Sequence, residues 1–339
     1  MSLETLLARY LPEVEEEMRA VVQTADPRHA DLFGMLRYHM GWADADFNPC
    51  QARTGKRIRP LLCLLTCEAC GADWEQALPA ASSVELMHNF TLIHDDIEDQ
   101  DRTRRGRTTV WVLWGEAQAI NAGDTLFALA QLALLRLSER GVPITTVVEA
   151  LHSLNRTCVA ITGGQYLDIG FEDRDDVSIA DYLAMIERKT AALSACACEM
   201  GTTIAAAPDS QRQRLAAFGY HMGMTFQMRD DVLGIWGDPT VTGKPAGADI
   251  ARRKKSLPII HGLEQSGELR ALLAQDVLTE SDVHRATELL AETDSREYAE
   301  QLMLKHHSQA LTALEEASVS GPAAQGLYEL AQALLDRER

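Results

Sequence analysis

The stretch HNFTLIHDDIEDQDRTRRGR, residues 88–107, carries an apolar helical run into five acids within seven residues and then into four arginines within six. If the helix continues through the acids, Asp95 and Asp99 lie on one face, with Thr91 one turn and His88 two turns before them. These carboxylates would stand at the negative end of the helix dipole, where cations are stabilising and carboxylates are not. The stretch therefore predicts a helix end that needs positive charge beside it.

A magnesium site would supply that charge. Mg²⁺ takes oxygen ligands and is commonly bound through one or two carboxylates together with substrate phosphates. The arginines that follow offer forked donors suited to the same phosphates; they are Arg102, Arg104, Arg105 and Arg107. The plain alternative is a solvated acidic turn neutralised by a basic loop. The acidic doublet and the spacing of four on an otherwise apolar helix favour the metal site.

A second acidic doublet follows another apolar helical run. In FQMRDDVLGIWGD, residues 226–238, Asp230 and Asp231 come one turn after Phe226 and Gln227. Two acidic helix ends of the same kind, far apart in the sequence, suggest two facing walls of one Mg²⁺–diphosphate site.

Short basic segments elsewhere point to a small phosphorylated ligand. GKRIRP, residues 55–60, leads into a predicted helix, and cations at a helix start oppose its dipole unless an anion lies nearby. Lys189 precedes a run of small and apolar residues, where a lysine either extends outward or points at an anion. Lys244 lies in a Gly/Pro loop before the basic run at 252–255, which could close over a phosphate or be a solvated charge run.

Composition limits the classes of partner. The chain has 339 residues, 46% of them hydrophobic, and a formal net charge of −18. This balance argues against nucleic acid or an anionic membrane as a general partner, because a dispersed phosphate backbone needs a basic face. Seven cysteines and no signal peptide fit reduced thiols, so we expect a cytoplasmic protein. No apolar run reaches the roughly 20 residues of a membrane-spanning helix.

Three cysteines raise a separate possibility. Cys63, Cys67 and Cys70 have the CxxxCxxC spacing that holds an iron–sulfur cluster in radical enzymes using S-adenosylmethionine. In those enzymes the motif follows a strand of a β/α barrel, whereas here it lies in a leucine-rich helical run. Cysteine in such a run behaves as a small core residue. We therefore expect these thiols to pack in the protein core.

Apolar periodicity predicts helices along the whole chain. We find no convincing alternating strand run, linker or short-period repeat. The sequence therefore predicts an all-α fold, a single-domain bundle over residues 1–339 with long helices around a central active-site cavity. The expected helices cover residues 2–24, 28–43, 61–70, 77–97, 117–137, 144–169, 178–201, 208–236, 282–293, 295–317 and 322–337.

Taken together and in order, these motifs resemble those of the trans-isoprenyl diphosphate synthases, or polyprenyl synthetases. The family's first motif, DDxxD, reads here as residues 95–99, DDIED, and its arginine pair is Arg104-Arg105. As an ordered set the matches are highly specific. The others are GKRxRP at 55–60, GQ at 164–165, KT at 189–190, FQxxDD at 226–231 and GKPxG at 243–247, with a further lysine best aligned with Lys254.

The resemblance implies the isoprenoid synthase fold and head-to-tail condensation of an allylic diphosphate with isopentenyl diphosphate. It implies three Mg²⁺ ions per site, bound by Asp95, Asp99 and Asp230, which assist departure of the allylic diphosphate. The expected catalytic residues are Asp95, Asp96, Asp99, Arg104, Lys189, Asp230, Asp231 and Lys244. The expected substrate-binding residues are Lys56, Arg59, His88, Arg105, Thr190, Phe226, Gln227 and Lys254. The resemblance also implies a homodimer.

Product length in this family should depend on the residues one turn before the first motif, which here are Phe90 and Thr91. A bulky Phe90 resembles the floor of short-chain synthases. This favours geranylgeranyl diphosphate, the twenty-carbon product, with the fifteen-carbon farnesyl product next.

One position departs from the family pattern. Gly234 stands where the second motif usually has its last aspartate, which removes a potential carboxylate near the metal, and Asp238 does not share its helical face. Two alternatives remain open. A class I terpene cyclase shares the fold but would have little use for GKRIRP or for a second acidic doublet. A non-catalytic partner subunit is favoured only by Gly234 and opposed by the retained cations.

Overall fold

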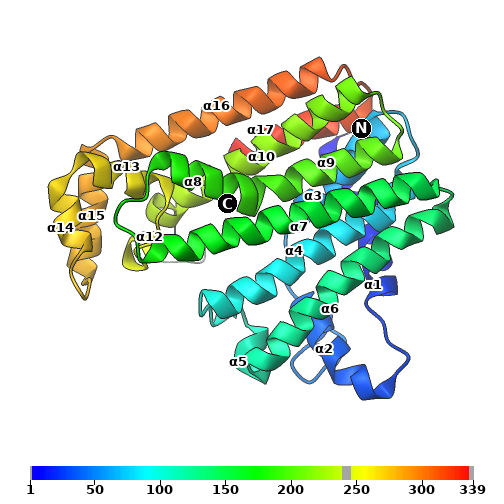
Figure 1. The fold of residues 1–339 in the computed structure, drawn as a ribbon, viewed down its shortest axis with the longest axis horizontal. Coiled ribbons are helices and arrows are strands. Elements are labelled where there is room, and N and C mark those ends of the chain that lie inside the picture. Colours follow the sequence, from blue (N-terminus) through cyan, green and yellow to red (C-terminus); the bar gives the residue numbers. More distant parts are fainter. Residues whose placement is uncertain (1, 239–245, 336–339) are drawn as a thin grey trace. The chain divides into compact units, whose positions relative to one another are not determined.

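The structure is a computed structural model that describes residues 2–238 and 246–335 (Figure 1). Nearly all of its regular structure is helical, so the prediction of an all-α fold is confirmed. Contacts divide the chain into two compact units. The first contains residues 1–156, 196–212 and 319–326, and the second contains residues 157–195, 213–318 and 327–339. That these form a single domain stays a prediction.

The first unit is organised on helix α4, Leu78–Glu98, which packs along α6, Glu116–Leu135. The two helices meet through small residues, since Ala80, Ala119 and Ala122 are fully buried. The other elements are α1 Leu3–Val21, a 3₁₀ turn Pro27–His29, α2 Ala30–His39, α3 Ile58–Ala69, a 3₁₀ turn Trp74–Ala77, β1 Thr103–Arg104, β2 Arg107–Thr108, α5 Val110–Trp114, a 3₁₀ turn Arg136–Arg140, the first part of α7 Ile144–Glu172 and most of α9 Ala192–Ile204.

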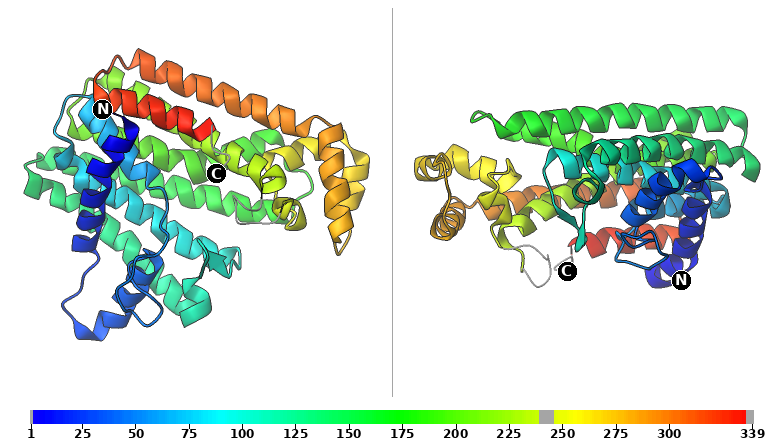
Figure 2. Two further views of the ribbon diagram at one scale, coloured as in Figure 1. Left: turned by 180° about the vertical axis from the view of Figure 1, so that it is seen from behind. Right: turned by 90° about the horizontal axis from the view of Figure 1, so that it is seen from below.

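The second unit contains most of α10, Asp209–Trp236, packed with α16, Ser295–Glu316, around a core that includes Tyr182, Met228 and Met303. Helices α14 and α15 lie side by side in both views of Figure 2 and share a smaller core with α12. The remaining elements are α8 Ile179–Ile186, a π-helical turn Glu187–Ala191, α12 Ala248–Ala251, α13 Leu257–Gln265, α14 Gly267–Leu273, α15 Glu280–Glu292 and α17 Pro322–Leu335.

The long predicted helices are present, with one interruption. Ser178 caps α8 because its hydroxyl accepts from the Asp181 N–H at 3.1 Å while the Asp181 carboxylate accepts from the Ser178 N–H. The helix expected up to residue 201 is broken after Ile186 by the π-helical turn and then resumes as α9. Such a turn inserts an extra residue, which hydrophobic periodicity does not reveal.

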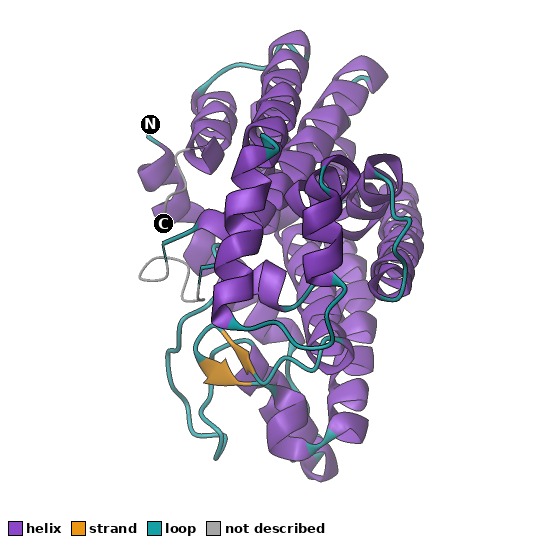
Figure 3. Ribbon diagram, turned by 90° about the vertical axis from the view of Figure 1, so that its left-hand side faces the viewer, coloured by secondary structure: helices purple, strands orange, loops and turns teal. Residues whose placement is uncertain are grey.

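The expectation that the chain has no strands is wrong in one place. Strands β1 and β2 form an antiparallel hairpin, drawn in orange in Figure 3, in which Thr103 pairs with Thr108 and Arg104 with Arg107. Two residues per strand are too few to show an alternating pattern. The short helices α5, α12, α13 and α14 were missed for the same reason of length.

The three cysteines of the CxxxCxxC pattern lie in α3 and at its end, as predicted. Cys63 and Cys67 are buried and Cys70 is partly buried. Burial raises the pKa of Cys67 to about 12 and that of Cys70 to about 11, so these thiols stay protonated. No helix in the described part of the chain combines the length and apolar character that crossing a bilayer requires.

Candidate functional site

Helix α4 presents the first acidic motif at its C-terminal end. The helix continues to Glu98, and the Asp99 N–H donates to the Asp95 carbonyl at 2.8 Å. The side chains of Asp95 and Asp99 therefore lie one turn apart, as their spacing predicts. Asp95 is half-buried and Asp99 is exposed, so both can meet a ligand that arrives at the helix end.

Asp96 has a different environment from its neighbours in the motif. It is 1% exposed, and one of its carboxylate oxygens accepts from Arg104 Nε at 2.5 Å. Burial raises the pKa of Asp96 to about 6, and the Arg104 guanidinium opposes that rise. Asp96 thus fixes the arginine that the sequence predicts to be catalytic.

The hairpin places the two predicted arginines. Arg105 and Gly106 form its turn with φ values of 54° and 77°, and positive φ at both central positions suits the twist of a two-residue hairpin. Arg107 attaches the hairpin to residues 38–43, because its guanidinium donates to the carbonyls of Tyr38, at 2.8 Å, and Ala43, at 2.7 Å. Arg104 and Arg105 are therefore carried on a fixed turn.

Arg57 anchors the basic segment 55–60 in the core. It is 4% exposed, and its guanidinium donates to Glu85 at 2.6 Å and to Glu15 at 2.8 Å. Its backbone is left-handed, with φ 52°, at the start of α3. For a residue other than glycine this conformation costs roughly 1–2 kcal/mol. The two ion pairs hold it, and so fix the backbone that carries Lys56 and Arg59 on either side.

His88 lies among the cations of the first unit. Burial lowers its pKa well below the usual value, and the charges of Arg59 and Arg105 lower it further. The imidazole is therefore neutral and offers one donor and one acceptor without adding charge. Arg59, His88 and Arg105, all predicted to bind substrate, thus lie close enough to influence one another, while Lys56 is exposed.

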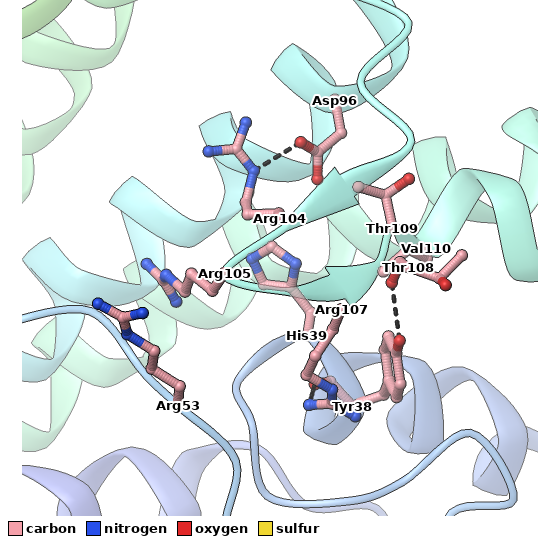
Figure 4. A pocket seen from close by; sticks show the side chains of 10 residues that line it. All are labelled: Tyr38, His39, Arg53, Asp96, Arg104, Arg105, Arg107, Thr108, Thr109 and Val110. Carbon is pink, nitrogen blue, oxygen red and sulfur yellow. Dashed lines mark hydrogen bonds and ion pairs between the residues drawn. The ribbon is translucent and has the colours of Figure 1, made fainter. Parts of the chain in front are cut away.

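A small pocket of about 20 Å³ lies beside the hairpin (Figure 4). Its lining is rich in cations, and it includes His39, whose Nε2 has no hydrogen-bond partner among the described residues. The pocket has room for about one water molecule. Sequence reasoning missed His39 and Arg53, because neither belongs to a spaced motif. The lining residues are Tyr38, His39, Arg53, Asp96, Arg104, Arg105, Arg107, Thr108, Thr109 and Val110.

Phe90 is packed under the first motif. It is 8% exposed, and its ring centroid lies 5.2 Å from that of His94 and 5.4 Å from that of Phe127 on α6. The Thr91 hydroxyl donates to the His88 carbonyl at 2.7 Å, so it is turned onto its own helix. Of the two predicted chain-length residues, Phe90 presents the larger apolar surface. Phe127, which the sequence did not indicate, supports it.

In the second unit, two glycines explain how Lys189 and Thr190 are presented. These residues lie in the π-helical turn. A Cβ at Gly164 of α7 would lie 2.4 Å from the backbone nitrogen of Lys189, and a Cβ at Gly223 of α10 would lie 2.6 Å from the Ala191 Cα. Only glycine allows both helices to approach the turn so closely.

Lys189 and Thr190 each have a partner in this unit. Lys189 Nζ lies 2.6 Å from a carboxylate oxygen of Asp168 on α7. The Thr190 hydroxyl donates to Gln227 Oε1 at 2.9 Å. Lys189 thus neither extends into solvent nor stands alone in the core. It is held by the Asp168 carboxylate, which sequence reasoning did not assign to the site.

Asp231 is the buried member of the second doublet, as Asp96 is of the first. It is 0% exposed and accepts from the Tyr182 hydroxyl, from Gln227 Nε2 at 3.1 Å and from the Leu257 N–H at 3.1 Å. Lys254 Nζ lies 3.5 Å from it. Asp231 therefore joins α8, α10 and α13, and Tyr182 is a partner that sequence reasoning missed.

The other residues predicted for the second wall lie near this cluster or outside the described part. Asp230 and Phe226 are partly buried on α10. Burial lowers the pKa of Lys254, but the carboxylates around it, Asp231 first, raise that pKa above its usual value, so the ammonium stays charged. Lys244 lies outside the described residues.

Comparison with known proteins identifies the family. The model of the polyprenyl synthetase family matches residues 44–290. The chain belongs to the polyprenyl synthetase family. Its fold is that of solved members of the family.

The chain is similar to relatives that are named for two different products, geranylgeranyl diphosphate and farnesyl diphosphate. A geranylgeranyl diphosphate synthase of Mycobacterium tuberculosis is 41% identical over 94% of this chain and 89% of its own length. A (2E,6E)-farnesyl diphosphate synthase of Mycobacterium bovis is 38% identical over 93% and 89%. The crystal structure of a polyprenyl synthetase from Streptomyces coelicolor A3(2) superimposes with a TM-score of 0.90 at 36% identity, covering 98% of this chain and 99% of that one.

The ion pairs of Arg57 predict a large effect on the stability of this synthetase. Arg57→Met should lower the free energy of unfolding by about 3–5 kcal/mol, because it leaves Glu85 buried without its cation. Chemical denaturation measures this. Arg53→Met, which removes an exposed arginine from the same segment, should change the free energy by less than about 0.5 kcal/mol. Equal effects of the two substitutions would contradict the assigned role of Arg57.

Proposed function

We propose that this polyprenyl synthetase is a Mg²⁺-dependent trans-prenyltransferase. It condenses isopentenyl diphosphate head-to-tail with an allylic diphosphate to give a short-chain product, mainly geranylgeranyl diphosphate. The observation that carries the proposal is that each unit by itself presents an acidic doublet with one aspartate paired to a cation, Asp96 with Arg104 and Asp231 with Lys254. The other aspartate of each doublet, Asp95 or Asp230, is only partly buried. Relatives named for the twenty-carbon and fifteen-carbon products support the short-chain class.

Magnesium fits the donors that the chain offers. Asp95 and Asp99 present carboxylate oxygens one turn apart, and Asp230 presents another on α10. Among the described residues, no group of three or more His, Cys, Asp or Glu side chains is arranged to hold a metal ion alone. This suits Mg²⁺, which commonly binds through one or two carboxylates and completes its shell with substrate phosphates and water. Three bound ions would neutralise charge on the departing diphosphate.

The cations of the chain divide between the two substrates. Arg104, Lys189, Lys244 and Lys254 bind the allylic diphosphate and stabilise the charge that gathers on it as the carbon–oxygen bond breaks. Lys56, Arg59, His88 and Arg105 hold isopentenyl diphosphate, whose double bond attacks the allylic cation. A neutral His88 contributes by hydrogen bonding only. The released diphosphate takes the final proton, so the reaction needs no dedicated side-chain base.

Turnover tests the proposal directly. The purified protein, incubated with Mg²⁺, isopentenyl diphosphate and farnesyl diphosphate, should yield geranylgeranyl diphosphate by mass spectrometry, and dimethylallyl diphosphate should be extended to the same length. Chelation of the metal should abolish the products. Hydrocarbon release would instead favour a terpene cyclase. The absence of any elongation with all three allylic diphosphates would favour a partner subunit, as Gly234 allows.

The packing of Phe90 predicts control of product length. Phe90→Ala should shift the products beyond twenty carbons, because it removes the ring that packs against His94 and Phe127 one turn before the first acidic motif, and Phe90→Leu should shift them less. Met87→Ala on the same helix is the control, since it also empties a buried site. Met87→Ala should cost stability, about 2–5 kcal/mol, without lengthening the product. Unchanged products from Phe90→Ala would show that this residue is not the floor.

We also propose that two copies of the chain form the enzyme. In the first unit, α6 and the start of α7 expose large apolar side chains; they are Ile120, Leu132 and Leu135 on α6 and Ile144 and Val148 on α7. Apolar residues gathered on neighbouring helices fit an interface with a second copy. Light scattering should give twice the mass of the chain, and Leu132→Glu should reduce it to one copy. Val277→Glu, a control at an even more exposed apolar residue outside these two helices, should leave the mass unchanged.

A further inference from the structure

Two residues that line the small pocket beside the hairpin each have a buried polar atom with no hydrogen-bond partner among the described residues. They are His39, through Nε2, and Asp96, through Oδ2. Figure 4 shows both side chains at this pocket. Buried polar atoms in folded proteins nearly always have a partner, so two unpaired atoms at one pocket need an explanation.

The pocket has the size and the lining of a water site. Its volume is about 20 Å³, which is enough for one water molecule. A buried water molecule needs about two to four polar partners. His39 Nε2 and Asp96 Oδ2 can supply two of them, and the Arg105 side chain lines the same pocket.

His39 suits this position because its ring is neutral. Burial lowers its pKa well below the usual value, and the charges of Arg105 and Arg104 lower it further. The side chain of Asn89 opposes this shift only in part. A neutral imidazole has one N–H donor and one acceptor. It can therefore hydrogen-bond to a water molecule among arginines without adding positive charge.

The end of α2 holds His39 against the hairpin. The Tyr38 hydroxyl donates to the Thr108 carbonyl at 2.7 Å, and the Arg107 guanidinium donates to the Tyr38 carbonyl at 2.8 Å. The same guanidinium lies 3.8 Å from the centre of the Tyr38 ring. Because Tyr38 directly precedes His39, these contacts fix the backbone of His39 relative to the hairpin.

We propose that one buried water molecule links His39 Nε2 to Asp96 Oδ2, and that His39 is thereby a positioning residue for Arg104. The other carboxylate oxygen of Asp96 accepts from Arg104 Nε at 2.5 Å. With the water in place, each oxygen of this carboxylate has its own partner. Without it, the carboxylate is free to turn and Arg104 moves with it. That Arg104 stabilises the departing diphosphate rests on the proposed function.

A purely structural role for His39 makes a different prediction. If the ring only filled space, His39→Leu would lower the thermal midpoint of unfolding and would change turnover by the same factor whether or not Arg104 is present. The test therefore measures elongation of farnesyl diphosphate in two backgrounds, the starting protein and Arg104→Met. Thermal unfolding of each variant is measured alongside.

His39→Leu should lower kcat by roughly 10–100-fold, because displacement of a catalytic group by about 1 Å can cost a hundredfold. The KM for isopentenyl diphosphate should not change, since Arg104 is assigned to the other substrate. His39→Gln should restore most of kcat, because its amide nitrogen can donate to the same water. In the Arg104→Met background, His39→Leu should lower kcat by less than about twofold.

Met35→Ala is the control for lost stability. Met35 is buried on the same helix and does not line the pocket. Its truncation should lower the thermal midpoint and leave kcat unchanged. A loss of kcat in Met35→Ala as large as that in His39→Leu would assign the effect to stability and overturn the inference.

A high-resolution crystal structure tests the water without turnover. It should show a water molecule within hydrogen-bonding distance of both His39 Nε2 and Asp96 Oδ2, and His39→Leu should lack it. No water at that place in the starting protein would overturn the inference, as would an unchanged kcat in His39→Leu or an equal loss in both backgrounds. If His39→Leu does not fold, this structure decides. Failure of the starting protein to elongate any allylic diphosphate would instead contradict the proposed function.

Discussion

The constraint on which this structure depends is the crowding of carboxylates near the C-terminal ends of two helices, where the helix dipole already disfavours them. Both doublets meet it in the same way. The second aspartate of each, Asp96 or Asp231, is buried against a cation, Arg104 or Lys254. The first aspartate of each, Asp95 or Asp230, stays partly exposed. One member thus pairs with a cation within the fold, and we propose that the other meets the metal and substrate.

The cations need rigid support because a misplaced charge does little for a transition state. Local backbone features supply that rigidity. Arg105 sits on a two-residue turn with positive φ, and Arg57 holds a left-handed backbone through the buried Glu85 and the partly buried Glu15. Lys189 lies in a π-helical turn. Two neighbouring helices approach this turn closely because each has a glycine at the contact. Each feature places a charge within a unit before any ligand arrives, which lowers the reorganisation that catalysis requires.

The sequence predicts most of the fold and the residue types of the candidate site, because long amphipathic helices have a strong period and the motifs are ordered. It predicts that Asp95 and Asp99 share a face, and they do. It does not predict that Asp96 and Asp231 turn inward, because adjacent residues of a doublet look alike in a sequence. Tyr182 and Glu85 were missed because tertiary contacts alone make them partners, at separations of 28 residues for Arg57–Glu85 and 49 for Tyr182–Asp231. The hairpin and the π-helical turn were missed because each is too short for a hydrophobic periodicity to show in the sequence.

The proposed function requires that Asp95, Asp99 and Asp230 bind Mg²⁺ together with diphosphate. A crystal structure of the protein grown with Mn²⁺ and inorganic diphosphate tests it most directly, since the anomalous signal of Mn²⁺ locates each ion independently of the model. We expect Mn²⁺ with diphosphate at Asp95 and Asp99 on α4 and also at Asp230 on α10. Mn²⁺ at only one of these two helices, or a diphosphate held by arginine and lysine without any ion, would contradict the proposed function.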